Sequence, residues 1–203
     1  MPLVKERPTL SRILDAYGTV LLAPMGAMAG YLSLMPAFQK LLGDHYFEVL
    51  GVWLGVVLVV YCAALEGTLR LRSALLILFA SCGAHQIASY VAFFGAIYGP
   101  SSHNLEAVPA CALFLGGFVG ALILSLVFLY FNLRNKHGFV SKLLVCSLTG
   151  GVLGVVGAYL GSALGDHAKK DVIARMSPIL YILWQAGMAV TLGLALKSDT
   201  HQR

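Results

Sequence analysis

Two long apolar runs of this chain carry polar side chains near their centres. His85 and Gln86 are adjacent within the run 73–98, and Gln185 lies near the middle of the run 176–196. Hydrocarbon offers an imidazole or a carboxamide no hydrogen-bond partner, so burying such a group alone is costly. These side chains must therefore face other helices or a water-filled cavity, where they could bind a solute through hydrogen bonds.

Helical spacing places further candidate residues beside these polar groups. Ser89 follows His85 by one helical turn and so shares its helix face. Tyr181 and Trp184 precede the glutamine of the last run, and Met28 lies at a similar depth in the first run. The two rings and the thioether would form apolar walls around the polar groups. The predicted substrate-binding residues are His85, Gln86, Ser89, Gln185, Trp184, Tyr181 and Met28.

The same residues also have a purely structural interpretation. Side-chain hydrogen bonds between transmembrane helices contribute about 0.6 kcal/mol each, and His85 and Gln185 could serve only to hold helices together. Intramembrane ionisable residues, however, commonly mark functional sites. Both interpretations stay open: a polar pocket near the membrane midplane, as in many transporters, or a set of interhelical hydrogen bonds.

No catalytic, metal-binding or cofactor motif accompanies these residues. The sequence has no Walker loop, no HExxH and no GxSxG, so an enzyme is unsupported and we name no catalytic residue. A transmembrane haem needs paired axial histidines, and His85 is the only histidine deep in an apolar run. His45, His103 and His167 lie in three different loops, without the close spacing of metal ligands. We therefore expect no metal site and no cofactor.

The composition identifies the class of protein. Of the 203 residues, 59% are hydrophobic and 11% are charged, and the mean hydropathy is +0.82. Soluble domains carry about 25% charged residues, so this chain cannot cover its surface in water. The formal net charge of +5 does not indicate nucleic-acid binding, because the basic residues lie in short loops between apolar runs. We predict a single transmembrane domain over residues 1–203 with the lipid bilayer as its partner.

Six apolar runs are long enough to be membrane-spanning helices. The hydrocarbon core is about 30 Å thick and needs about 20 helical residues to cross it. Spanning segments must satisfy their backbone internally, and no alternation typical of barrel strands occurs. The predicted helices cover residues 17–38, 46–66, 73–98, 108–132, 139–165 and 176–196. The expected fold is therefore an all-α, polytopic integral membrane bundle of six transmembrane helices.

Lysine and arginine predict the orientation of this bundle. Ten of the 14 basic residues fall on the side that holds both termini, and four fall on the other. Cytoplasmic loops carry the excess of basic residues, so both termini are predicted to be cytoplasmic. We expect a bacterial-type cytoplasmic (inner) membrane, with an organellar membrane as the alternative.

Glycines spaced four residues apart recur in most of the apolar runs. The run 139–165 carries Gly150, Gly154, Gly157 and Gly161 on one stripe. Small residues let helix backbones approach closely in lipid, where the hydrophobic effect between helices is weak. We expect this run to be a central packing element of the bundle. The Gly-rich faces could alternatively form an interface in a homo-oligomer or with a partner membrane subunit.

These features predict a small membrane carrier, channel or solute-binding subunit for a small polar or amphipathic molecule. The alternative is an accessory or structural subunit of a larger membrane protein complex. A lipid-modifying enzyme is a third hypothesis, but it would need polar groups at the depth of the membrane interface. A cavity beside His85 would favour the first hypothesis. A solid core with a flat exterior of small residues would favour the second.

Overall fold

The regular elements of the computed structural model are all helices within the residues that it describes. These residues are 9–43, 50–66, 70–98, 110–133, 138–164 and 178–200. The helices are α1 (Thr9–Ser33), α2 (Pro36–Leu42), α3 (Val52–Glu66), α4 (Leu71–Tyr98), α5 (Ala110–Asn132), α6 (Phe139–Leu164) and α7 (Pro178–Thr200). The prediction of an all-α chain that is rich in apolar helices is confirmed for these residues.

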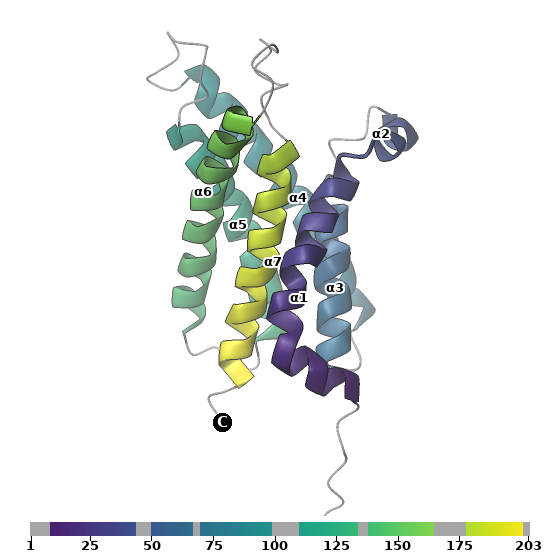
Figure 1. The fold of residues 1–203 in the computed structure, drawn as a ribbon. Helices are drawn as coiled ribbons and strands as arrows, with labels where there is room; N and C mark the ends of the chain where they lie inside the picture. The colour runs from purple at the N-terminus through teal and green to yellow at the C-terminus, as the bar shows by residue number, and fades with distance from the viewer. Residues whose placement is uncertain are drawn as a thin grey trace, which may run out of the picture.

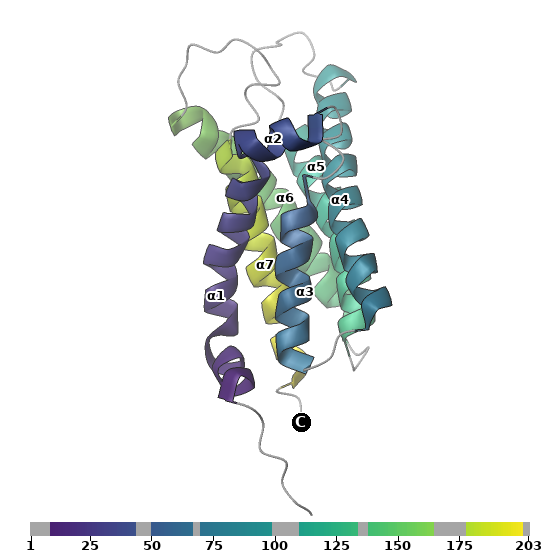
Figure 2. The ribbon, with the colours of Figure 1, turned by 90° about the vertical axis from the view of Figure 1, so that its right-hand side faces the viewer.

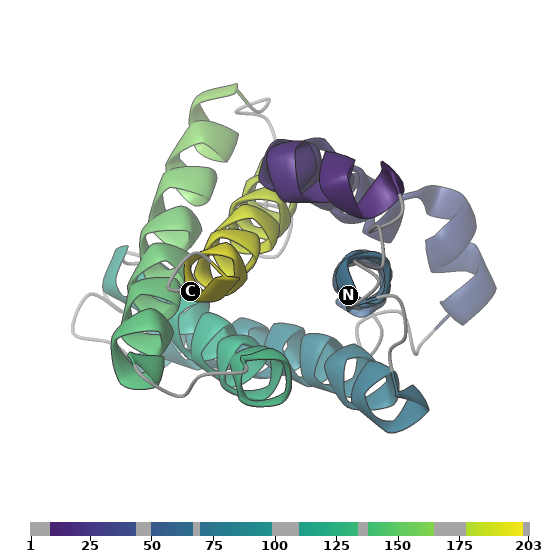
Figure 3. The same ribbon diagram turned by 90° about the horizontal axis from the view of Figure 1, so that it is seen from below.

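The long helices form an antiparallel bundle (Figure 1). Each long helix packs against the next one along the chain, from α1 and α3 through α3 and α4, α4 and α5, and α5 and α6 to α6 and α7. The last helix, α7, also packs against the first, α1. Helix α7 also contacts α3 and α5, and Figure 3 shows it enclosed by α1, α5 and α6. The first long helix begins and the last one ends at the same end of the bundle.

Among the described residues, four helices are long and apolar enough to cross a membrane by themselves. They lie within α4, α5, α6 and α7, and a fifth span results if α1 and α2 are counted together. The apolar part of α3 covers only Val52–Ala64. The whole helix of 15 residues rises about 22 Å, which is less than the hydrocarbon thickness of about 30 Å. The coarser prediction of a helical membrane bundle is thus supported, while six crossings are not confirmed.

The first predicted helix, 17–38, is broken near its end. Helix α1 stops at Ser33, and α2 begins at Pro36 with a bend of 55° between them. Met35 is extended, with φ −62° and ψ 133°, because the ring of a following proline disfavours the helical conformation. Proline itself is well tolerated in the first turn of a helix. Figure 2 shows α2 running crosswise to the long helices, and Figures 1 and 3 show that it lies to one side of the bundle.

Helix α3 begins partway along the bundle and is held there by side chains of its neighbours. The Ser33 hydroxyl donates to the carbonyl oxygen of Leu50 at 2.8 Å, and the Ser81 hydroxyl donates to that of Gly51 at 2.7 Å. Ser81 lies about three turns into α4, so α3 starts at the level of the first half of α4 and not at the level of its C-terminal end. A Cβ at Gly51 would collide with the Ser81 carbonyl group.

The run 139–165, expected to be a central packing element, is less buried than the neighbouring helix α5. Helix α6, which covers this run, packs mainly against α5 and α7, and 33% of its span is buried, compared with 56% for α5. Its glycines nevertheless lie at close helix contacts. A Cβ at Gly154 would lie 2.6 Å from the Leu113 carbonyl oxygen, and one at Gly157 would lie 2.9 Å from the Leu180 Cα. Glycine spacing therefore indicated close contacts of this helix but not its position in the bundle.

Large apolar side chains cover much of the outside of the bundle. Val20, Phe79, Tyr98 and Val140 are 66–78% exposed, which is the arrangement expected of a surface in contact with lipid. The interior is a continuous apolar cluster that includes Leu58, Leu124, Phe128, Met188 and Leu192. The helices thus bury one apolar face against each other and present a second apolar face to their surroundings, as transmembrane helices do.

Candidate functional site

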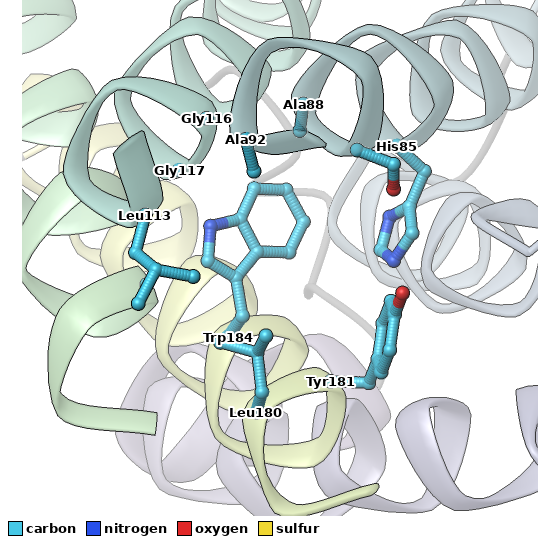
Figure 4. Close-up of a pocket in the computed structure, with 11 residues that line it drawn as sticks. His85, Ala88, Ala92, Leu113, Gly116, Gly117, Leu180, Tyr181 and Trp184 are labelled. Atoms are coloured by element: carbon cyan, nitrogen blue, oxygen red, sulfur yellow. The ribbon is translucent and has the colours of Figure 1, made fainter. Parts of the chain in front are cut away.

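The imidazole of His85 lies between two aromatic side chains of α7. His85 occupies the middle of α4 and is 4% exposed. Its ring stacks on Tyr181, with the ring centroids 5.5 Å apart, and meets Trp184 edge-on at 5.2 Å. Figure 4 shows the three rings around one space, with α4 on one side and α7 on the other. The sequence therefore brings together one polar ring from the third predicted helix and two rings from the last.

A pocket opens beside these rings between α4, α5, α6 and α7. The space open to the centres of water molecules is about 60 Å³. One water molecule needs about 10–15 Å³ by this measure, so the pocket has room for several waters or one small molecule. The lining residues are His85, Ala88, Ser89, Ala92, Leu113, Gly116, Gly117, Gly154, Leu180, Tyr181 and Trp184.

Small residues on α4, α5 and α6 create this space. Gly116 and Gly117 line the pocket with backbone and have no side chain to add to its wall. A Cβ at Gly116 would lie 2.7 Å from the Ala88 carbonyl oxygen, and one at Gly117 would collide with the carbonyl of Gly150. The helices are therefore already as close as their backbones allow. The rings of α7 cannot be covered by side chains from the opposite wall, so a pocket remains.

The described residues that line the pocket provide hydrogen-bonding groups but no charged side chain of Asp, Glu, Lys or Arg. Ser89 contributes a hydroxyl, Tyr181 a phenol, Trp184 an indole N–H and His85 an imidazole. Figure 4 shows the indole nitrogen directed towards the wall near Leu113 and Gly117. The pocket is thus mostly apolar, with a few polar groups that could orient a ligand, which is the usual character of small-molecule sites.

Several buried polar atoms at this depth have no hydrogen-bond partner within the described part of the chain. They are Nδ1 of His85, Nε1 of Trp184, and both Oε1 and Nε2 of Gln185. Most buried polar groups in proteins are paired, because an unpaired one loses its hydrogen bonds to water without replacement. Four such atoms on residues 85, 184 and 185 form an exception that needs a physical reason.

Gln185 is buried as predicted but does not line the pocket. Its side chain is fully buried, and the backbone carbonyl oxygen of this residue would lie 2.7 Å from a Cβ added at Gly26. It therefore sits where α7 crosses α1, one residue beyond the indole of Trp184. Gln86 is half-buried and is also outside the pocket lining. The structure thus brings together His85, Ser89, Tyr181 and Trp184, with Gln185 beside them.

Met28 does not reach the pocket, and its predicted position as an apolar wall is corrected. Its side chain is 56% exposed. Gly26 and Gly30 turn towards α7, where added Cβ atoms would lie 2.7 Å from the Cα atoms of Ala186 and Ile182. Because successive helical residues are about 100° apart, Met28 then points away from α7 and out of the bundle.

Sequence reasoning missed the pocket residues that carry no polar group. They are Ala88, Ala92, Leu113, Gly116, Gly117, Gly154 and Leu180. The available signal was the clustering of glycines in the runs 108–132 and 139–165, which we interpreted only as a packing device. Glycines that let two helix backbones approach closely can also form the wall of a neighbouring pocket, as Gly116, Gly117 and Gly154 do here.

Metal binding finds no support in the described part of the chain, where no three His, Cys, Asp or Glu side chains come together to hold an ion. His45, His103 and His167 lie outside the described residues, so the prediction about them stays untested.

Comparison of the chain with protein-family models, curated proteins and solved structures found no match. Any function must therefore be inferred from the chemistry of the site itself.

Proposed function

We propose that this protein is a small membrane carrier or solute-binding subunit that takes a small molecule into the pocket beside His85. The observation that carries the proposal is the group of buried polar atoms on His85, Trp184 and Gln185, at one depth of the bundle, that have no partner among the described residues. They lie in or beside a pocket formed by four helices. Polar groups kept in such a position are well suited to bind and release a solute.

The structural alternative explains these residues less well. If His85 and Gln185 served only to hold helices together, their polar atoms would be paired with groups on neighbouring helices. Two serines of the same bundle do behave in this way: Ser33 and Ser81 each donate to a backbone carbonyl group on a neighbouring segment. His85 Nδ1 and the Gln185 carboxamide have no such partner among the described residues. This contrast supports a binding role.

A carrier fits the interior better than an open channel. Beyond the pocket, Leu124 and Phe128 of α5 and Met188 and Leu192 of α7 are fully buried and pack in one apolar cluster. These side chains lie one to three turns further along their helices than the pocket residues. They leave the pocket closed towards the end of the bundle at which α7 ends. A site accessible from one side at a time is what alternating access requires.

The topology belongs to the same proposal. We infer six crossings, with α1 and α2 together as the first and the short α3 as the second, accommodated by local thinning of the bilayer. The division of basic residues, ten against four, supports cytoplasmic termini. The membrane would be the cytoplasmic membrane of a bacterium or an organellar membrane. The pocket would then lie nearer to the outer side.

A second candidate function is that of a subunit in a larger membrane complex. One observation favours it: Tyr90, Phe94 and Tyr98 of α4 are 50–78% exposed and form a ladder of stacked rings on the outside of the bundle. Such a ladder suits a partner helix, although aromatic side chains are also common where a membrane meets water. A pocket beside His85 is not needed for this function, so we place it second.

The test of the carrier proposal is solute entry into proteoliposomes. Stopped-flow light scattering would follow vesicles that contain wild-type protein, Ser89→Leu, which fills the pocket, or Val152→Leu, which changes an exposed position of α6. A panel of small neutral and charged solutes would be compared with protein-free vesicles. We expect at least one solute to enter faster with wild type and Val152→Leu, and at the protein-free rate with Ser89→Leu.

A solute-binding subunit would bind without transporting, so thermal stabilisation of the purified protein would be measured with the same panel. Binding that is present in wild type and Val152→Leu but lost in Ser89→Leu supports the proposal. If no solute enters faster and none stabilises the wild type, the proposal is refuted. In that case the complex-subunit alternative gains support.

A further inference from the structure

We propose that the pocket selects an uncharged, planar carboxamide of about four non-hydrogen atoms, the size of acetamide or urea. This inference rests on the proposed function and specifies its substrate class. Three independent properties of the pocket lead to it: the absence of charge from its lining residues, the kind of hydrogen-bonding groups that it presents, and its size.

The first property is charge. None of the eleven residues that line the pocket is Asp, Glu, Lys or Arg. An ion taken from water into apolar surroundings loses its hydration, and without an opposite charge the protein cannot compensate that loss. Transporters of charged substrates commonly supply a charged group or a helix terminus at mid-depth. The pocket lies instead along the continuous stretches of α4 and α7, which favours an uncharged occupant.

The second property is the pattern of donors and flat surfaces. The indole Nε1 of Trp184 is buried without a partner among the described residues, and an indole nitrogen can only donate. An occupant that bonds to this nitrogen must bring an acceptor, and a carbonyl oxygen is the acceptor best suited to an N–H donor. His85 Nδ1, also without a partner among the described residues, can bond to an amide group. The faces of the Tyr181 and Trp184 rings suit a flat molecule.

The third property is size. The space of about 60 Å³ is well below the roughly 150 Å³ of a cavity that admits benzene. Ala88, Ala92 and the wall glycines limit its width, and their backbones are already in close contact. A molecule with about four non-hydrogen atoms fits this space, whereas an aromatic amide would require the rings of α7 to move.

The test uses three probes of the same shape that differ in charge: acetamide, which is neutral, acetate, an anion, and acetamidinium, a cation. The chain has two tryptophans, Trp53 and Trp184. In a Trp53→Phe background, the fluorescence of Trp184 reports on the pocket directly. Each probe would be titrated at neutral pH into this protein in lipid nanodiscs, with benzamide as the oversized control.

We expect saturable fluorescence changes with acetamide, and at least about 100-fold weaker binding of acetate and acetamidinium, because only these must be buried with a charge. Ser89→Leu should abolish the acetamide response, while Val152→Leu, which changes an exposed position of α6 outside the pocket, should retain it. Ser89→Val provides a second, smaller filling variant. Helical circular dichroism of each variant confirms folding.

Three outcomes would overturn the inference. Equal or tighter binding of either ion would show that the pocket does not select uncharged molecules. An acetamide response that persists in both folded filling variants would place binding elsewhere. Lack of any acetamide response, combined with pocket-dependent entry of another solute into proteoliposomes, would refute the amide class and leave the carrier proposal standing. Failure of every solute in both assays would instead refute the carrier proposal itself.

Discussion

Replacing Gln185 with leucine should stabilise this protein, although glutamine in a helix bundle is usually regarded as a stabilising residue. The side chain is fully buried, and neither Oε1 nor Nε2 has a hydrogen-bond partner among the described residues. A buried polar group without a partner costs about 1–3 kcal/mol. Leucine has a similar volume and no polar atom, so it should remove this cost without opening a large cavity.

The expected gain is therefore about 1–3 kcal/mol in the free energy of unfolding, if the amide has no structural role. For a chain of 150–250 residues this corresponds to about 2–4 °C in Tm for each kcal/mol. Unfolding would be measured in bicelles by denaturant titration, with thermal unfolding as the second readout. Gln185→Met, which keeps the unbranched shape, should behave in the same direction.

Gln39→Leu is the matched control. Gln39 is an exposed glutamine on α2, where the same replacement should change stability by less than about 0.5 kcal/mol. If Gln185→Leu and Gln185→Met both destabilise the protein by about 1 kcal/mol or more, the carboxamide has a structural partner. The unpartnered polar atoms would then no longer support a binding site.

Three further predictions concern the pocket, the helix contacts and the topology. His85→Leu should abolish solute binding, measured by Trp184 fluorescence, while leaving the unfolding free energy unchanged or higher. Solute binding that falls only in proportion to the folded fraction would contradict this. Gly154→Leu should lower stability by about 1–3 kcal/mol in denaturant titrations, because the added side chain meets the Leu113 backbone, whereas Val152→Leu on the exposed face of the same helix should not. Equal melting temperatures of the two variants would refute that reasoning. A cysteine placed beside His103 should react with an impermeant thiol reagent only from outside the cell, and labelling only from the cytoplasm would reverse the proposed orientation.

Much of the secondary structure could be predicted from the pattern of apolar residues. The runs 73–98, 108–132, 139–165 and 176–196 correspond closely to α4, α5, α6 and α7. A long uninterrupted apolar segment in lipid has one good solution, a helix, because only its own backbone can satisfy its hydrogen bonds. These helices are therefore local consequences of the sequence.

The first two runs were predicted less well, for an identifiable reason. Hydropathy continues across Met35 and Pro36, so the run 17–38 read as one helix, although the proline was a visible signal for the break at that point. The start of α3 is later than predicted, near Gly51, where Ser81 of a different helix binds the backbone. That contact depends on the packing of α3 against α4 and has no local signal.

Half of the candidate site follows from residue types alone. A histidine and a glutamine at the centres of apolar runs had to be buried, and both are, because lipid gives their polar atoms no partner. Ser89, Tyr181 and Trp184 were expected near His85 from helical spacing, and they line the same pocket. Which groups are polar and how deep they lie are properties of the linear sequence.

The tertiary structure decided the rest, namely how each helix is rotated about its axis. The contacts of Gly26 and Gly30 with α7 turn Met28 out of the bundle, so a residue of suitable type and depth faces away from the site. Glycines of α5 and α6 became pocket walls only because α7 places its rings opposite them. Hydropathy specifies the depth of a residue, but nearly uniform apolar helices carry little information about rotation. The backbone contacts between small residues provide it, and they exist only in the assembled bundle.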